Sequence, residues 1–314
     1  MEVAGDGVLV VDKPEGPTSF DVVARLRRAL GAKRAGHTGT LDPLATGVLA
    51  VCVGEAVKLQ HYLAEGDKSY LGTVAFGTAT DTEDALGRVT ERGDPSALDA
   101  GSVAAALPGL VGELSQIPPM YSAVRVGGRR LHEAARAGEE VEREPRSVVV
   151  HRLELVSFEP ARGGLASARI EVRCGKGTYV RTLAADLGRR LGVPAHLAAL
   201  RRTAAGPFAI EDAIPLRRAE EMGRSDPAAL WARLVSPADA LSHLPAVRLE
   251  PGEVEDLAHG RLVRRPPPGP LCRALDPAGR LVAVCGPDAS GRWVRPIRVM
   301  VQARDSTGAA ARNH

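Results

Sequence analysis

The stretch G-H-T-G-T-L-D-P-L-A-T-G at residues 36–47 is the part of this 314-residue chain from which its fold is best interpreted. It is a tight polar loop around one carboxylate, Asp42, and Pro43 pushes Asp42 toward an extended conformation. The runs G-V-L-V-V at 7–11 and V-L-A-V-C-V at 48–53 are both apolar and predict buried strands. The second run is apolar on both faces, so we expect it at the centre of a sheet. The core should therefore hold the loop.

An Asp-Pro pair on its own commonly starts a turn. Here three glycines and three threonines surround it, and glycine lets the backbone approach a ligand closely. In that setting Asp42 is a candidate nucleophile or base. A metal site is harder to support, because His37 is the only other candidate ligand nearby and the spacing matches no metal motif. The loop therefore predicts a catalytic carboxylate and no metal.

Working outward, D-K-P-E-G-P-T-S at 12–19 predicts a turn, and a helix should follow it at once. Thr18 and Asp21 have the spacing of a capping box, and Gly31 can end the helix. The apolar face of this helix consists of Val22, Val23, Leu26 and Leu30. The pattern predicts further strands at 68–76, 148–158 and 168–174, and helices around 101–114 and from Val180 onward.

The order of these elements predicts a mixed α/β (α+β) fold with two domains. Residues 1–240 should form a large catalytic domain, whose antiparallel-rich mixed sheet is flanked by helices. It should carry an exposed basic insertion near 120–146. Short strands with Gly and Pro turns at 246–302 predict a small β-barrel, and the polar tail at 303–314 should be disordered.

Composition limits the function classes that remain. The chain has no membrane-length apolar run and no signal-like N-terminus, so we expect a cytoplasmic protein. The net charge of +3 permits a polyanionic partner, although the arginine bias can also reflect genome composition. The four cysteines form no paired motif, which disfavours zinc and disulfides. The chain carries neither a phosphate-loop motif nor a dinucleotide-binding fingerprint.

The loop at 36–47 closely resembles the catalytic loop of the TruB family of pseudouridine synthases. The resemblance extends, in the family's order, to V-D-K-P-E-G-P-T-S at 11–19, K-S-Y at 68–70, T-D-T-E-D at 80–84, Q-I-P-P-M-Y-S-A at 116–123, G-K-G-T-Y-V-R-T-L-A-x-D-L-G at 175–188 and H-L-x-x-L-R-R-T at 196–203. These segments cover most of residues 8–210. Two departures, Arg125 in place of lysine and His132 in place of tyrosine, lie in the segment that resembles the family's RNA-gripping insertion.

The resemblance implies an RNA-modifying enzyme that isomerises uridine 55 in the T-loop of tRNA. Asp42 would attack or polarise the ribose, the glycosidic bond would break, and the uracil would turn and rejoin the sugar through carbon. Such a reaction needs no cofactor or metal. Arg181 would pair with Asp42, and Tyr70 would stack on the flipped uracil, with a proton-carrying role for its hydroxyl left open. Without the resemblance, Arg181 would be interpreted as a surface charge and Tyr70 as core.

Four further residues match family positions that contact substrate. His37 would touch RNA near the flipped base, and Tyr179 and Leu200 would line the uracil pocket. Leu200 can equally be an ordinary core leucine. Lys13 would either contact phosphate or support the Asp42 loop, and the sequence does not separate these roles. The small C-terminal domain resembles the family's PUA RNA-binding domain.

Two other functions remain open at this point. One is a non-catalytic tRNA-binding or tRNA-folding protein of the same fold, which would tolerate loss of Asp42, Tyr70 and Arg181, yet all three are present. The other is a guide-RNA-directed synthase, which would ordinarily carry longer terminal extensions. We expect a monomer that binds the T-arm of tRNA, without a membrane or an obligate protein partner.

Overall fold

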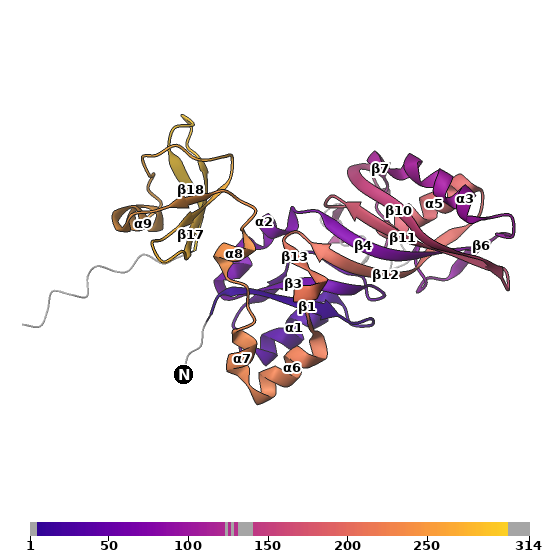
Figure 1. Cartoon of the computed structure of the whole chain (residues 1–314), viewed down its shortest axis with the longest axis horizontal. Coiled ribbons are helices and arrows are strands. Elements are labelled where there is room, and N and C mark those ends of the chain that lie inside the picture. Colours follow the sequence, from indigo (N-terminus) through magenta and orange to yellow (C-terminus); the bar gives the residue numbers. More distant parts are fainter. Residues whose placement is uncertain (1–4, 123–124, 127–128, 131–140, 301–314) are drawn as a thin grey trace, which may run out of the picture.

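The computed structural model describes residues 5–122, 125–126, 129–130 and 141–300, and its centre is one large mixed sheet (Figure 1). The strand order is β14-β1-β3-β12-β4-β11-β10-β7, with β2 also paired to β3 and β13 to β12. The strands are β1 (Gly7–Lys13), β2 (Ala35–His37), β3 (Thr46–Val53), β4 (Lys68–Phe76), β7 (Gly112–Gln116), β10 (Arg146–Arg162), β11 (Leu165–Cys174), β12 (Ala195–Ala205), β13 (Phe208–Ala209) and β14 (Ile214–Pro215). Only β1–β14 and β3–β12 are parallel, which confirms the predicted antiparallel-rich mixed sheet.

Strands β1 and β3 are buried on both faces, as the apolar runs predicted. Because side chains alternate along a strand, successive residues belong to two different hydrophobic cores. The first core contains Leu9, Val11, Leu49, Val51 and Val53. The second contains Val8, Val10, Val48, Ala50 and Cys52. The two strands therefore form a wall between these cores, and the Asp42 loop leads directly into β3.

Helices cover the first-core face of the sheet. They are α1 (Ser19–Ala29), α3 (Ala100–Ala106), α5 (Val180–Leu191), α6 (Leu216–Ser225) and α7 (Pro227–Trp231), each of which contributes buried side chains to the first core. Figure 1 shows α1, α6 and α7 grouped beside β1 and β3, and α3 and α5 near β10 and β11. Thr18 and Asp21 form the predicted capping box of α1. The apolar face predicted for this helix is buried.

The second core is closed by short elements and by the C-terminal part of the chain. Its covering elements are η1 (Gly54–Leu59), α2 (Gln60–Ala64) and α8 (Pro237–Ala240). From the small domain come Leu275, Leu281, Val284 and Met300. The remaining short elements are β5 (Thr78–Thr80), β6 (Val89–Arg92), η2 (Leu107–Leu110) and η3 (Ile210–Asp212).

Two regions differ from the sequence-based expectation. The helix expected around 101–114 was too long: α3 ends at Ala106, Pro108 and Gly109 fall in the 3-10 turn η2, and Gly112–Gln116 is the edge strand β7. The strand β12 was not predicted, although it lies in the middle of the sheet between β3 and β4. Both differences arise where the pairing partner is distant in sequence.

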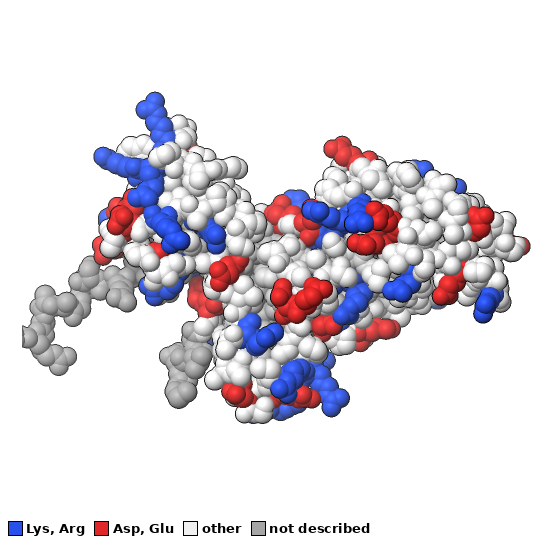
Figure 2. Space-filling model, in the orientation of Figure 1, with Lys and Arg blue, Asp and Glu red and all other residues white. Residues whose placement is uncertain are grey.

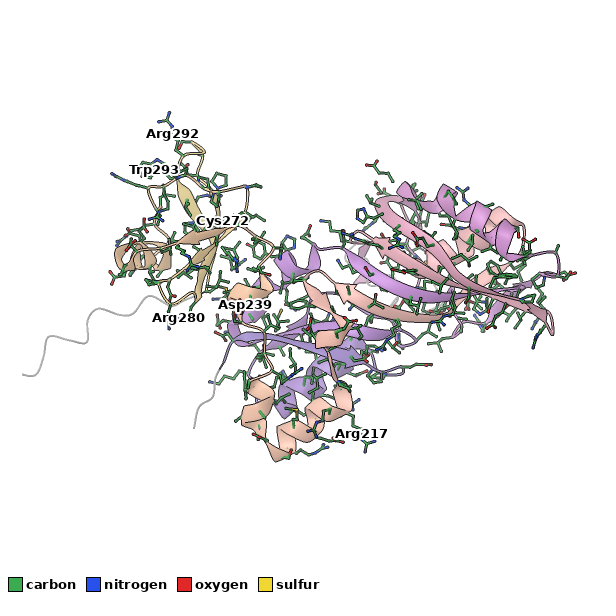
Figure 3. The ribbon with its side chains drawn as sticks, in the orientation of Figure 1. Arg217, Asp239, Cys272, Arg280, Arg292 and Trp293 are labelled. Atoms are coloured by element: carbon green, nitrogen blue, oxygen red, sulfur yellow. The ribbon has the colours of Figure 1, made fainter. Side chains whose placement is uncertain are left out.

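The C-terminal segment forms a small sheet in the order β15-β16-β17-β18, with α9 (Pro251–Ala258) packed against it. Its strands are β15 (Ala246–Arg248), β16 (Cys272–Leu275), β17 (Leu281–Pro287) and β18 (Val294–Val299). A bridge from Val263 to Val294 adds a further segment beside β18, and the described pairings do not join β15 to β18. In Figure 3, Arg292 and Trp293 lie at the outer end of this domain, and Cys272 lies within it.

The insertion near 120–146 is described only in part. β8 (Arg125–Val126) and β9 (Arg129–Arg130) form a small antiparallel pair, whereas His132 and the tail at 303–314 lie outside the described residues. All four cysteines are buried and free. Among the described helices, none has the length and apolar character needed to cross a membrane.

Candidate active site

The Asp42 loop is tied to the start of α1 by one buried side chain. The Ser19 hydroxyl donates to the Leu41 carbonyl at 3.0 Å and accepts from the Leu41 amide at 2.8 Å. At the other end of the loop, Gly47 has φ of +100° and lies against β12, where an added Cβ would come within 2.1 Å of the Arg202 carbonyl oxygen. The glycines of the loop were expected to let the backbone approach a ligand closely. At Gly47 the backbone instead lies close to strand β12.

Lys13 supports this loop from inside the protein. Its side chain is fully buried, and its ammonium donates to the carbonyls of Pro14 at 2.8 Å, Pro43 at 3.3 Å and Ala45 at 2.8 Å. An ammonium has three donors, so none is left over for a phosphate. Burial lowers the pKa of Lys13 to about 8, against the opposing effect of the Asp42 carboxylate. Of the two roles left open for Lys13, this geometry supports the one in which it holds the loop.

The Asp42 carboxylate faces the buried guanidinium of Arg181. Nε of Arg181 lies 3.3 Å from Oδ2 of Asp42, and Nη1 lies 3.6 Å from Oδ2 of a second carboxylate, Asp84. The Arg181 side chain is 5% exposed and Asp84 is 7% exposed, whereas Asp42 keeps 36% of its side-chain surface open. The pairing of Arg181 with Asp42 that the resemblance implied is present. Asp42 is the member of this trio that a ligand can reach.

A left-handed residue shapes the turn that carries Asp84. Glu83 has φ of +63°, a conformation that is uncommon outside glycine and marks local strain. The residues on either side of it both face Arg181: the Thr82 carbonyl accepts from Nη1 at 3.3 Å, and Asp84 supplies the second carboxylate. Glu83 itself accepts from the Thr182 hydroxyl on α5 at 2.7 Å. The turn thus fixes the position of Arg181.

The protonation of Asp42 depends on opposing effects. Burial raises the pKa of Asp42 above its usual value, and the nearby Asp84 charge acts in the same direction, whereas the Arg181, Lys13 and Arg202 charges oppose the rise. Desolvation makes a carboxylate more basic, and a fixed cation keeps its ionised form accessible. A carboxylate with a raised pKa in an open position suits nucleophilic or base chemistry.

Tyr70 lies on β4 with Val74 and Phe76 on the same face, as the alternation predicted, and 8% of its surface is exposed. Burial raises the pKa of Tyr70, and Asp42 and Cys174 act in the same direction. The positive charge of Arg202 opposes the rise in that pKa. The phenol is therefore protonated at neutral pH.

The remaining candidates surround this centre unequally. Tyr179 is the residue before α5, its ring centroid is 5.9 Å from the Arg181 guanidinium carbon, and the Gln116 side chain holds its backbone at both N–H and C=O. Leu200 lies on β12, with a methyl carbon 3.6 Å from where a Cβ on Gly72 would stand. His37 ends β2 and its buried Nδ1 has no hydrogen-bond partner among the described residues. Burial and the Arg202 charge lower the pKa of His37, so its imidazole is neutral at pH 7.

Two buried residues in this centre were not singled out from the sequence. Asp84 shares Arg181 with Asp42, and Arg202 donates to the loop. The segments T-D-T-E-D and L-R-R-T contain them, so the signal lay in motifs already noticed but not resolved into residues. Within the described part of the chain, no group of three or more His, Cys, Asp or Glu is placed to bind a metal ion.

Comparison with known proteins gives consistent matches along the chain. Residues 27–180 match the TruB family pseudouridylate synthase (N terminal domain), residues 181–242 the tRNA pseudouridylate synthase B C-terminal domain, and residues 244–301 the tRNA pseudouridine synthase II, C terminal. A protein of Symbiobacterium thermophilum named tRNA pseudouridine synthase B is 53% identical over 81% of this chain and 82% of its own length. A protein of the same name from Stutzerimonas stutzeri is 43% identical over 94% of this chain and 95% of its own length.

Solved structures agree on the fold. A chain in the crystal structure of a Cbf5-Nop10-Gar1 complex matches with a TM-score of 0.72 and 26% identity, covering 95% of this chain and 85% of that chain. A chain in the structure of an H/ACA RNP bound to a substrate RNA containing 2'-deoxyuridine gives a TM-score of 0.71 at 24% identity, covering 95% of this chain and 86% of that one. The second likeness supports the fold alone.

Proposed function

Because the chain belongs to the TruB family of pseudouridine synthases, we propose that it converts uridine 55, in the T-loop of tRNA, to pseudouridine with Asp42 as the catalytic carboxylate. The chain is an enzyme of the isomerase class, and conversion of uridine to pseudouridine in tRNA is its reaction. The observation that carries the site assignment is the pairing of the accessible Asp42 carboxylate with the buried Arg181 guanidinium.

The proposed reaction balances within the substrate. The bond between N1 of uracil and C1′ of ribose breaks, the base turns, and a bond from C5 of uracil to C1′ replaces it. The proton on C5 leaves and N1 gains one, so neither an oxidant nor an energy source is consumed. Asp42 attacks the ribose or stabilises its positive charge, and Arg181 keeps the carboxylate ionised and aimed. Burial raises the pKa of Asp42, which makes it a stronger nucleophile once it is ionised.

The target uridine has to leave the base stack to reach Asp42. Flipping a nucleotide costs a few kcal/mol, and stacking on an aromatic ring returns about 1–3 kcal/mol per base. Tyr70 supplies that ring, and Tyr179 and Leu200 form walls of the pocket. His37, at the end of β2, contacts RNA beside the vacated position. Lys13 holds the loop and does not contact the RNA.

The small domain supplies a basic surface for tRNA. Residues 246–300 contain nine arginines against six Asp and Glu, and Figure 2 shows basic side chains gathered over this domain. Arg264 stacks on Trp293, with its guanidinium carbon 4.8 Å from the ring centroid. Arginines on such a surface can bind the phosphates of RNA, and phosphate contacts dominate the affinity of proteins for nucleic acids. Residues 1–240 would thus catalyse and residues 246–302 would bind RNA, in a cytoplasmic monomer that grips the T-arm.

The two other functions receive less support. A non-catalytic tRNA-binding protein would not need Asp42, Tyr70 and Arg181 gathered in one polar centre of the core. A guide-RNA-directed enzyme is less well supported, because relatives named tRNA pseudouridine synthase B are 53% identical, against 26% for the chain in the Cbf5-Nop10-Gar1 complex.

Incubation of the purified protein with unmodified tRNA, without cofactors or guide RNA, is expected to give pseudouridine at one T-loop position. The measurement is mapping of pseudouridine along the whole tRNA by chemical labelling and primer extension. A tRNA in which uridine 55 is replaced by cytidine is the matched control and should remain unmodified. Modification at another position would overturn the substrate assignment, and activity only with added guide RNA would favour the guide-directed function.

Asp84→Asn is expected to shift the acidic limb of the rate–pH profile to lower pH. The Asp84 charge raises the pKa of Asp42, so removing that charge lowers the pKa and leaves Asp42 ionised in more acidic solution. The measurement is the single-turnover rate against pH. Asp81→Asn is the control, because Asp81 lies in the same turn but pairs with the exposed Arg88. If the acidic limb does not move in Asp84→Asn, the Asp84 charge does not affect the ionisation of Asp42.

A further inference from the structure

Arg202 is a buried cation in the middle of β12 with an unusual set of partners. Its exposed fraction is 2%, and no carboxylate of the described residues forms an ion pair with it. Its guanidinium donates instead to three main-chain carbonyls: Nε to Val48 at 2.7 Å, Nη1 to Thr40 at 3.3 Å and Nη2 to Gly39 at 3.1 Å. Burying a charge without an ion-pair partner is costly, so a function has to account for this residue.

The three carbonyls that accept hydrogen bonds from Arg202 lie on both sides of Asp42 in the sequence. Gly39 and Thr40 precede Asp42, and Val48 lies on β3 after the loop has ended. The main chain of Arg202 adds a further contact, because it pairs in parallel with Gly47. One residue of β12 thus connects the entry and the exit of the catalytic loop.

Arg202 is also placed next to the second candidate catalytic residue. It lies opposite Tyr70 in the β12–β4 pairing, and its positive charge opposes the rise that burial causes in the pKa of the Tyr70 phenol. The side chain of Arg202 therefore binds the loop that carries Asp42, while its backbone belongs to the pairing with the strand that carries Tyr70. The planar guanidinium has five donors in fixed directions, so it can hold several acceptors at once in one geometry.

We propose that Arg202 is a positioning residue for the isomerisation: it clamps the two ends of the Asp42 loop and fixes that loop relative to the strand that carries Tyr70. This inference rests on the proposed function of the site. It assigns Arg202 no contact with the reacting atoms. Its effect is to hold Asp42 at the distance and angle that attack on the ribose requires, and a shift of about 1 Å in such a group can cost about 10²-fold in rate.

The first test compares lysine substitutions at neighbouring positions of the same strand. In Arg202→Lys the positive charge remains, but one ammonium cannot reach all three carbonyls. We expect the single-turnover rate to fall about 10²-fold while tRNA affinity changes less than about threefold. The matched control is Arg201→Lys, because Arg201 forms a half-exposed pair with Asp12. Its rate should stay near that of the wild type. A near-wild-type rate for Arg202→Lys overturns the proposal.

The second test measures the loop itself in the free protein. Amide hydrogen exchange in Arg202→Lys should be faster within residues 36–47 and unchanged in α5 and in the small domain. Faster exchange everywhere, with a rate loss that only follows the unfolded fraction, would make Arg202 a general stability residue and overturn the proposal. Unchanged exchange in the loop would also overturn it. If Arg202→Lys does not fold, Arg202→Gln is measured in its place. If neither variant folds, Arg202 is a general stability residue and the proposal is overturned.

The third test uses pH to separate charge from geometry. The charged groups that face Asp42 are Arg181, Asp84, Lys13 and Arg202. Arg202→Gln removes one cation and should move the acidic limb of the rate to higher pH, whereas Arg202→Lys should leave the limb in place and lower the plateau. If the acidic limb does not move in Arg202→Gln, the Arg202 charge does not act on Asp42, and the proposed placement of Arg202 beside the Asp42 loop is contradicted. A wild-type enzyme inactive on tRNA would refute the proposed function, whereas an active wild type with an equally active Arg202→Lys refutes only this inference.

Discussion

Asp42→Asn is expected to abolish pseudouridine formation while leaving tRNA affinity within about tenfold, or about 1.4 kcal/mol, of the wild type. The amide of asparagine is neutral, so it can neither attack the ribose nor stabilise a positive charge on it. Asparagine has nearly the same size as aspartate, so the loop that Ser19, Lys13 and Arg202 hold should persist. Affinity should survive because phosphate contacts supply most of the binding energy.

The measurements for Asp42→Asn are single-turnover pseudouridine formation and equilibrium tRNA binding, at one fixed salt concentration. Asp81→Asn is the control, because it makes the same chemical change on an exposed turn. Turnover of Asp42→Asn near the wild-type rate would remove Asp42 from the mechanism. A loss of affinity far beyond tenfold would instead mean that Asp42 contributes mainly to binding.

Tyr70→Phe is expected to lose about 10²- to 10⁴-fold in single-turnover rate while binding tRNA nearly normally. The ring and its stacking energy of about 1–3 kcal/mol are kept, and only the hydroxyl is removed. Burial and the Asp42 charge raise the pKa of that hydroxyl, and the Arg202 charge opposes the rise. If the C5 proton of uracil leaves through this oxygen, its loss removes general acid–base catalysis, which is typically worth about 10²- to 10⁴-fold.

Tyr70→Leu separates the ring from the hydroxyl, because it lacks both. It should be as slow as Tyr70→Phe or slower, and it should also bind the flipped base less well. A fast Tyr70→Phe with a slow Tyr70→Leu would leave stacking as the only role and transfer the proton to Asp42 or to water. Near-wild-type rates for both variants would show that Tyr70 is an ordinary core residue.

Local sequence signals predicted the parts of the fold in which a strand or helix is specified by its own residues. The apolar runs at 7–11 and 48–53 predicted β1 and β3, because burial on both faces leaves no polar alternation. Thr18 and Asp21 predicted where α1 begins, because a capping box satisfies its own backbone donors. Asp42 was predicted from the composition of its loop, and its partner Arg181 through the family resemblance.

The features that the sequence did not predict depend on contacts between residues that are distant in sequence. Strand β12 has two adjacent arginines and several half-buried positions, so its apolar residues follow neither the strand period nor the helix period. It is held in place by its neighbours β3 and β4. Arg202 looks like a surface charge until its acceptors, more than 150 positions earlier in the chain, are known. Lys13 likewise needed its three carbonyl partners before its two roles could be separated.

The wall formed by β1 and β3 has a consequence for how the molecule folds. Alternate side chains of these strands belong to different cores, and the core on one side is completed by Leu275, Leu281 and Val284 from the small domain. The second core is therefore complete only when the small domain packs against it. The segment after residue 245 is therefore separate in sequence and shape, but its unfolding is thermodynamically coupled to that of the sheet. Cutting the chain there would remove Leu275, Leu281 and Val284 from the second core and open part of it to water, although η1, α2 and α8 would still cover the rest.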